Sequence, residues 1–165
     1  MALAVTIISD THLPRGRRRL PEACLERLRA ADHIVHAGDL IAVEVLEQLR
    51  ALGPPVTAVH GNVDAPAVRA ALPATATVRL EGVELAVLHD SGPAAGRLAR
   101  LRARFPTASA VVFGHSHIPL LEHDAGFAIF NPGSPTDRRR QPTHTMGLAR
   151  VSGEAISFEL VDLGA

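Results

Sequence analysis

Short runs of apolar and β-branched residues alternate with helical patterns over the first two thirds of the chain. Each run is short and is bounded by turn-forming residues, which is typical of buried strands. The runs are Val5–Ile8, His33–His36, Val56–Val59, Glu84–Leu88 and Ala110–Phe113. The patterns between them predict helices over residues 21–28, 43–52 and 94–104, and a further helix that starts near Pro66.

The last third of the chain changes to strand-like segments joined by turns. These segments cover residues 120–122, 127–130, 145–151 and 155–161. Alternating strands and helices followed by hairpins indicate an α/β sandwich with a mixed sheet. The chain has 165 residues and shows no linker or repeat, so we expect a single domain over residues 1–165.

Composition and charge narrow the class of function. The 17 basic residues, all Arg, balance 17 acidic residues, and a net charge of zero argues against a partner that is long nucleic acid or a membrane surface. The apolar segment Ala2–Ile8 lacks a basic flank and is too short to span a bilayer. The lone Cys24, interpreted as a core residue, excludes an internal disulfide and fits a cytoplasmic location. The sequence leaves a homo-oligomer open.

Polar side chains follow each of the five early strands. They belong to the segments Asp10-Thr11-His12, Gly38-Asp39, Gly61-Asn62, His89 and Gly114-His115-Ser116-His117. Sites in open α/β sheets lie beyond the carboxyl ends of strands, so we expect these side chains to converge. The spacing of two in the D-x-H and H-x-H pairs predicts that both members of each pair face one ion from an extended segment.

The converging donors indicate a metal centre. They are imidazoles, carboxylates and one amide without any thiolate, a set that suits zinc, manganese or iron. Seven donors are too many for one tetrahedral ion but fit two ions that share a carboxylate, as in phosphatases and nucleases. The candidate ligands are Asp10, His12, Asp39, Asn62, His89, His115 and His117.

The order of these motifs resembles that of the calcineurin-like metallophosphoesterases. The short length and the sequence Asn131-Pro132-Gly133-Ser134 are similar to a small bacterial and archaeal phosphodiesterase branch, and the resemblance spans residues 10–134. It implies a four-layer α-β-β-α sandwich with mixed sheets. It also implies one ion on Asp10, His12 and His117, a second ion on Asn62, His89 and His115, and Asp39 as the bridge.

The predicted function is that of a dinuclear metal-dependent phosphodiesterase acting on small phosphodiesters. A hydroxide between the two divalent ions attacks phosphorus in line, with manganese the first choice of metal and Zn, Fe, Ni or Co as alternatives. The rival functions are a phosphomonoesterase or nuclease at the same site and a non-catalytic scaffold of the same fold. The complete ligand set favours an enzyme. Val63, where many relatives have a substrate-contacting His, counts against a monoesterase.

Several further residues have two interpretations each. His36 and His60 precede candidate ligands and either contact the phosphate, support a ligand or simply close a strand. Asp64 either caps the helix near Pro66, which we favour, or orients a ligand. The substrate-binding candidates Arg138, Arg139 and Arg140, like the run 17–19, either dock a second ester arm or form a solvated loop.

Overall fold

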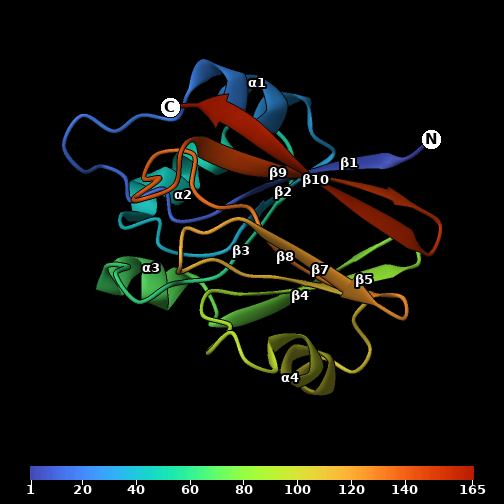
Figure 1. Cartoon of the computed structure of the whole chain (residues 1–165). Coiled ribbons are helices and arrows are strands. Elements are labelled where there is room, and N and C mark those ends of the chain that lie inside the picture. The colour runs from blue at the N-terminus through green and yellow to red at the C-terminus, as the bar shows by residue number, and fades with distance from the viewer.

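The computed structural model describes residues 1–165 and contains two five-stranded sheets packed face to face (Figure 1). The first sheet has the order β10-β9-β1-β2-β3 and the second has the order β4-β5-β6-β8-β7. Both sheets are mixed, since each contains parallel and antiparallel pairs. The strands are β1 (Leu3–Ile8), β2 (His33–His36), β3 (Val56–Ala58), β4 (Thr75–Leu80), β5 (Val83–Leu88), β6 (Ala110–Val112), β7 (Leu120–Asp124), β8 (Phe127–Asn131), β9 (His144–Ser152) and β10 (Ala155–Gly164).

Helices cover the outer faces of the two sheets, as Figure 1 shows for α1 and α2 on one side and α4 on the other. They are α1 (Glu22–Ala30), α2 (Val43–Arg50), α3 (Pro66–Ala71) and α4 (Arg97–Arg104). Three apolar clusters fill the three interfaces between layers. Within β1, for example, Val5 and Ile7 belong to the cluster between the sheets, whereas Ile8 packs with Cys24 of α1. The expected four-layer fold is confirmed.

The main element that the pattern failed to predict is β4. Its sequence alternates Thr and Arg with Ala and Val, and most of the strand is partly exposed, so it lacks the continuous apolar run of the other early strands. Pairing with β5 in an antiparallel hairpin, from Thr75 opposite Leu88 to Leu80 opposite Val83, stabilises it. Helix α4 begins at Arg97 rather than at residue 94, directly after the left-handed Gly96.

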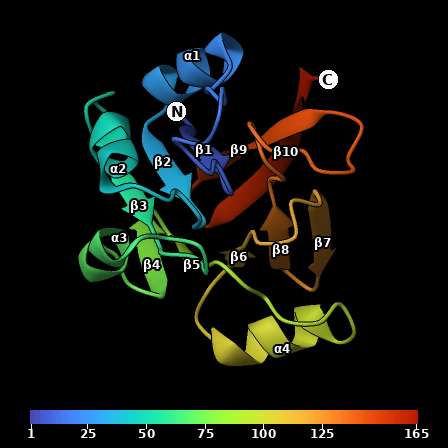
Figure 2. The same ribbon diagram turned by 90° about the vertical axis from the view of Figure 1, so that its left-hand side faces the viewer.

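Parallel pairing brings the loops after the early strands to one edge of the molecule. β1, β2 and β3 run parallel in the first sheet, and β5 and β6 run parallel in the second. Figure 2 looks onto the edge at which β1 ends. Backbone hydrogen bonds from Asp10 N–H to Gly38 C=O and from Gly114 N–H to His89 C=O join neighbouring loops there. No helix of the structure has the length and apolar character needed to cross a membrane.

Candidate metal centre

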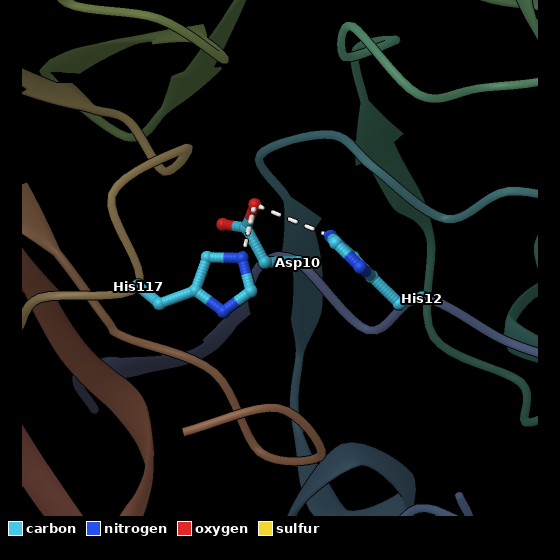
Figure 3. Close-up of side chains that lie close together, drawn as sticks. All are labelled: Asp10, His12 and His117. Carbon is cyan, nitrogen blue, oxygen red and sulfur yellow. Dashed lines mark ion pairs between the residues drawn. The ribbon is translucent and has the colours of Figure 1, made fainter. Parts of the chain in front are cut away.

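The first group of donors consists of Asp10, His12 and His117, all almost completely buried. The Asp10 Oδ1 atom lies 3.3 Å from His117 Nε2 and 3.8 Å from His12 Nε2. Figure 3 shows the two imidazoles approaching this one oxygen from different sides. The other carboxylate oxygen, Oδ2, accepts hydrogen bonds from Ser9 Oγ and His115 N–H. The chain therefore fixes the carboxylate through Oδ2 and directs Oδ1 at the imidazoles.

The second group joins Asp39, His89 and His115, with the amide of Asn62 between them. Asn62 Oδ1 lies 3.0 Å from His89 Nε2 and 3.0 Å from His115 Nδ1. Asp39 Oδ2 lies 3.1 Å from His89 Nε2 and 3.5 Å from His12 Nε2, so this carboxylate faces both groups. The structure thus brings all seven sequence-predicted donors together, and the Asp39 carboxylate lies between the two groups.

Unpartnered buried acceptors show that these residues fit divalent cations. His117 Nδ1 is placed to donate to the Asp137 C=O, which leaves the Nε2 lone pair directed at Asp10 Oδ1. Neither of these two atoms has a hydrogen-bond partner, and the same is true of the buried His12 Nε2. Buried acceptors that face one another are costly unless a cation lies between them. Imidazole nitrogens and carboxylate oxygens are ligands suited to Zn, Mn or Fe.

The carboxylates and imidazoles of the site stabilise one another's charged forms. Burial alone would raise the pKa of Asp10, but the attraction of the neighbouring His117 and His12 imidazoles outweighs it and holds this pKa well below its usual range. The pKa of Asp39 is likewise lowered by His12 and His89 in spite of burial. Burial would lower the pKa of His12, yet the two carboxylates raise it to about 9. In the metal-free site the two ionised carboxylates therefore favour protons on the His12 and His89 imidazoles.

The backbone at five of the seven ligand positions is left-handed, and for the H-x-H pair this corrects the expectation drawn from its spacing. The φ angles are 56° at Asp10, 49° at His12, 60° at Asp39, 72° at His115 and 60° at His117. Segments of this kind are not extended, and His115 and His117 consequently face different donor groups rather than one ion. Left-handed conformations of non-glycine residues cost about 1–3 kcal/mol each and concentrate at functional sites.

Two glycines make room for the ligands. A Cβ atom at Gly61 would collide with Asp39 Oδ1, and one at Gly114 would collide with Ser9 Oγ and lie 2.5 Å from Asp10 Oδ2. Only glycine lets the backbone approach the carboxylates so closely. The glycines before Asn62 and His115 therefore have a steric role in the site.

Asp64 orients the ligand loops and does not cap helix α3, so the favoured interpretation of this residue was wrong. The helix starts after Ala65 without a side-chain cap. The buried Asp64 carboxylate instead accepts hydrogen bonds from Asp39 N–H at 3.0 Å, from Gly61 N–H at 2.6 Å and from Ile41 N–H at 2.6 Å. The second polar residue of G-N-x-D thus ties the Asp39 loop to the Asn62 loop.

His36 and His60 have different surroundings. His36 is fully buried; its Nδ1 accepts from Gly38 N–H and its Nε2 lies 3.0 Å from Thr11 Oγ1. Burial lowers its pKa to about 4, so the ring is neutral at pH 7 and both nitrogens are occupied, which favours support of the ligand loops over contact with a phosphate. His60 is half-buried, and its Nδ1 has no partner.

Asp137 is a site residue that the sequence motifs did not indicate. Its carboxylate lies 3.6 Å from His12 Nδ1 and 3.0 Å from Arg18 Nη2, and its carbonyl faces His117 Nδ1. Asp137 therefore contacts two imidazoles of the first donor group, that of His12 with its carboxylate and that of His117 with its carbonyl. The only signal in the sequence is its place just after the Asn131–Ser134 motif and just before the predicted substrate-binding run Arg138–Arg140.

The run Arg138–Arg140 lies in a loop at the surface. Arg138 Nη1 donates to the Gln141 C=O within that loop, and Arg139 and Arg140 are exposed. None of the three lines the cavity that opens beside Asn62 and His89. Their role in substrate binding stays a prediction.

Comparison with known proteins identifies the family. The family model of the calcineurin-like phosphoesterase superfamily domain matches residues 3–154. The chain belongs to this superfamily. A probable metallophosphoesterase from Methanothermobacter thermautotrophicus is 31% identical to this phosphoesterase over 165 residues, which are 99% of this chain and 94% of the relative. A probable metallophosphoesterase from Methanocaldococcus jannaschii is 31% identical over 81% of this chain and 69% of its own.

Solved structures share the fold of this phosphoesterase. A protein of Thermotoga maritima superposes with a TM-score of 0.76 at 28% identity, over 98% of this chain and 99% of its own. Vps29 from Entamoeba histolytica in complex with zinc superposes with a TM-score of 0.78 at 21% identity, over 97% of this chain and 99% of its own. The predicted family is confirmed, and the Vps29 likeness shows the fold alone.

A first prediction concerns the bridging carboxylate of this phosphoesterase. Asp39→Asn removes charge that faces both donor groups, so affinity for both ions should fall by on the order of 100-fold. His117→Ala should weaken the binding of mainly one ion.

Metal analysis after equilibration with Mn²⁺ and gel filtration measures the number of ions per chain. Glu47→Gln, an exposed change on α2 with the same loss of charge, is the control. Two retained ions and a full hydrolysis rate in Asp39→Asn would exclude the bridge.

A second prediction concerns the stability of the metal-free phosphoesterase between pH 6.5 and 9. The pKa of His12 is raised from an ordinary value of 6.5 to about 9 in the folded state, which therefore holds an extra proton in this window. Its stabilisation is complete below pH 6.5 and is lost as the pH rises through 9; the raised pKa of His89 acts in the same direction.

Urea unfolding in EDTA at pH 6.5 and at pH 9 should therefore show a fall of on the order of 2 kcal/mol in the free energy of unfolding. Excess Mn²⁺ should reverse the trend, because deprotonated imidazoles bind metal. An equal free energy at both pH values in EDTA would contradict the prediction.

Proposed function

We propose that this protein is a dinuclear metal-dependent phosphodiesterase that hydrolyses small phosphodiesters. The observation that carries the proposal is the position of Asp39, whose Oδ2 lies within 3.5 Å of an imidazole nitrogen from each donor group. A carboxylate shared between two ion sites is the arrangement of two-metal phosphatases and nucleases. Manganese is the proposed metal, with Zn, Fe, Ni and Co as alternatives; the zinc complex of the Entamoeba Vps29 supports zinc among them.

The residues of the chain determine where the donor oxygens lie, which charge they carry and how the rim of the centre is shaped. When bound, two divalent ions supply neutralisation of the phosphate charge and a water of lowered pKa. Asp10 and Asp39 hold their free oxygens in place through hydrogen bonds to their other oxygens, so little reorganisation accompanies binding. Val63 and Ile118 directly follow candidate ligands and expose 38% and 52% of their surface. They give this part of the rim an apolar character that suits one organic ester arm.

The choice of a diester over a monoester rests on Val63. Its N–H donates to Asp39 Oδ1 at 2.9 Å, but its side chain can donate nothing to a departing oxygen or to the additional charge of a monoester. A small diester places one charge on the metal centre and an organic group on the rim.

The residues of this site support the scaffold hypothesis less well than the enzyme hypothesis. Vps29 proteins share the fold, and in a scaffold nothing requires metal ligands to be retained. Here all seven donors are present and converge, and Asp64 and Asp137 hold the loops that carry them.

The lone, buried Cys24 supports the cytoplasm as the proposed compartment.

The decisive experiment is turnover of bis-p-nitrophenyl phosphate and p-nitrophenyl phosphate by metal-stripped protein reconstituted with Mn²⁺, Zn²⁺, Fe²⁺, Ni²⁺ or Co²⁺. We expect hydrolysis that depends on metal, a preference for the diester in kcat/KM, and loss of activity in EDTA that added metal restores. Asp39→Asn is the inactive control and Glu47→Gln the active one. Full occupancy by two ions without turnover of either ester would support the scaffold.

Another prediction concerns the leaving group. General acid assistance is typically worth about 10²–10⁴-fold, and Val63 offers none, so the wild-type rate should fall steeply as the leaving-group pKa rises. Val63→His should flatten this dependence and raise monoesterase relative to diesterase activity. A series of aryl phosphodiesters with graded leaving-group pKa, run on both proteins, measures the two slopes.

Two outcomes would change this assignment. A shallow wild-type slope that steepens in His60→Ala would identify the half-buried His60 as the acid. A shallow slope in wild type, Val63→His and His60→Ala alike would mean that no side-chain acid is needed and that Val63 does not limit the reaction.

A further inference from the structure

A cavity of about 300 Å³ opens directly beside the second donor group. The candidate ligands Asn62 and His89 form one wall, and Arg69 of α3 and Arg104 of α4 also line it. Figure 2 shows α3 and α4 on either side of β4 and β5, the hairpin at whose end the cavity lies. An ester bound at the second donor group would therefore lie beside a cavity that two Arg residues line.

Arg69 is fixed in place by the ligand loop itself. Its Nη2 donates to the Asn62 C=O at 2.8 Å and its Nε donates to the Asp64 C=O at 3.1 Å. The third nitrogen, Nη1, makes no hydrogen bond, and no carboxylate forms an ion pair with the group. A guanidinium held by two carbonyls loses little side-chain entropy when it binds a further acceptor.

Arg104 supplies a second unpaired charge. It lies in the last turn of α4, forms neither a hydrogen bond nor an ion pair, and has its guanidinium carbon 5.4 Å from the centroid of the Phe105 ring. It also lines an adjoining cavity of about 240 Å³ together with Arg100, so positive charge continues along α4. In a chain of zero net charge this is a local excess, since α4 has four Arg and no acidic residue.

The remaining polar groups of the cavity do not neutralise the positive charge of Arg69 and Arg104. Asp90 is its one acidic side chain; Oδ1 accepts from Gly92 N–H, and Oδ2 lies 3.9 Å from His115 Nε2, outside hydrogen-bond distance. His60 also lines the cavity, and its buried Nδ1 has no partner. The cavity thus offers guanidinium donors and an unoccupied imidazole nitrogen, which is the chemistry of a phosphate-binding site.

We propose that this cavity is a second phosphate-binding subsite, formed by Arg69 and Arg104, and that the substrate carries a second phosphate group in addition to the ester phosphate at the metal centre. The proposal rests on the proposed function for the position of the scissile phosphate. It defines the substrate class as a small organic phosphoester with an additional phosphate arm.

The test compares adenosine 3′,5′-bisphosphate with adenosine 5′-monophosphate as ligands of the Mn²⁺-loaded protein, by calorimetry at constant free Mn²⁺. Exposed ion pairs contribute modestly to affinity, so the two guanidinium groups together should make wild type bind the bisphosphate about 5- to 30-fold more tightly. Arg104→Gln should remove most of that preference, and Arg69→Gln combined with it should remove the rest. Arg50→Gln, an exposed change at the far end of α2, should keep it.

Arg104→Gln is the more informative variant because Arg104 contacts no ligand loop, whereas Arg69 contacts the Asn62 backbone. Metal content and thermal unfolding of each variant show whether the centre is intact. Equal affinity for the two nucleotides in wild type, or a preference that survives in the double variant, would overturn the proposal. Loss of the preference only on replacing Arg138–Arg140 with Gln would overturn it in favour of that loop.

The result separates the subsite from the proposed function. A bisphosphate preference that depends on Arg104 but occurs without turnover of any diester would keep the subsite and reject the phosphodiesterase. Diester turnover without the bisphosphate preference would keep the phosphodiesterase and reject the subsite.

Discussion

The burial of two ionised carboxylates against imidazole lone pairs is the constraint on which the rest of this structure depends. Asp10 and Asp39 are almost fully buried, and each would be costly to keep charged in isolation. Each uses one oxygen for hydrogen bonds to the chain and leaves the other to face histidine nitrogens. Such an arrangement is stable only with cations between the acceptors, whether protons on the imidazoles or metal ions.

Contacts around the donor set hold this centre in its strained backbone geometry. Five of the seven donors are in left-handed conformations, and the loops that carry them are tied together by groups outside the donor set. Asp64 joins the Asp39 and Asn62 loops, and Ser134 Oγ donates to the Asp10 C=O. Thr136 Oγ1 donates to the Thr11 C=O in the same way. The hydrogen bonds of these buried groups offset the conformational cost at the ligands.

The two halves of the centre differ in charge and access. Around the first donor group Arg18 is paired with Asp137, and the histidines are buried. Around the second, His115 is partly exposed and Arg69 and Arg104 have no acidic partner. The second half is therefore the more open and the more positively charged side of the centre, whereas the first half is rigid and enclosed. The likeness to Vps29 shows the fold alone, and a function has to be argued from the residues of the site.

The sequence by itself determined the layers of the fold and the set of donors. Short β-branched runs between turn residues, such as His33–His36, indicate buried strands, and parallel strands bring the residues that follow them to one edge. Tertiary structure decided what depends on contacts between distant residues or on an unusual backbone. Spacing alone placed His115 and His117 on one ion. The family resemblance assigned them to different ions, and the left-handed backbone is the physical reason for the separation. Asp64 and Asp137 have their roles only through partners in other loops, and no local pattern records which loops the fold brings together.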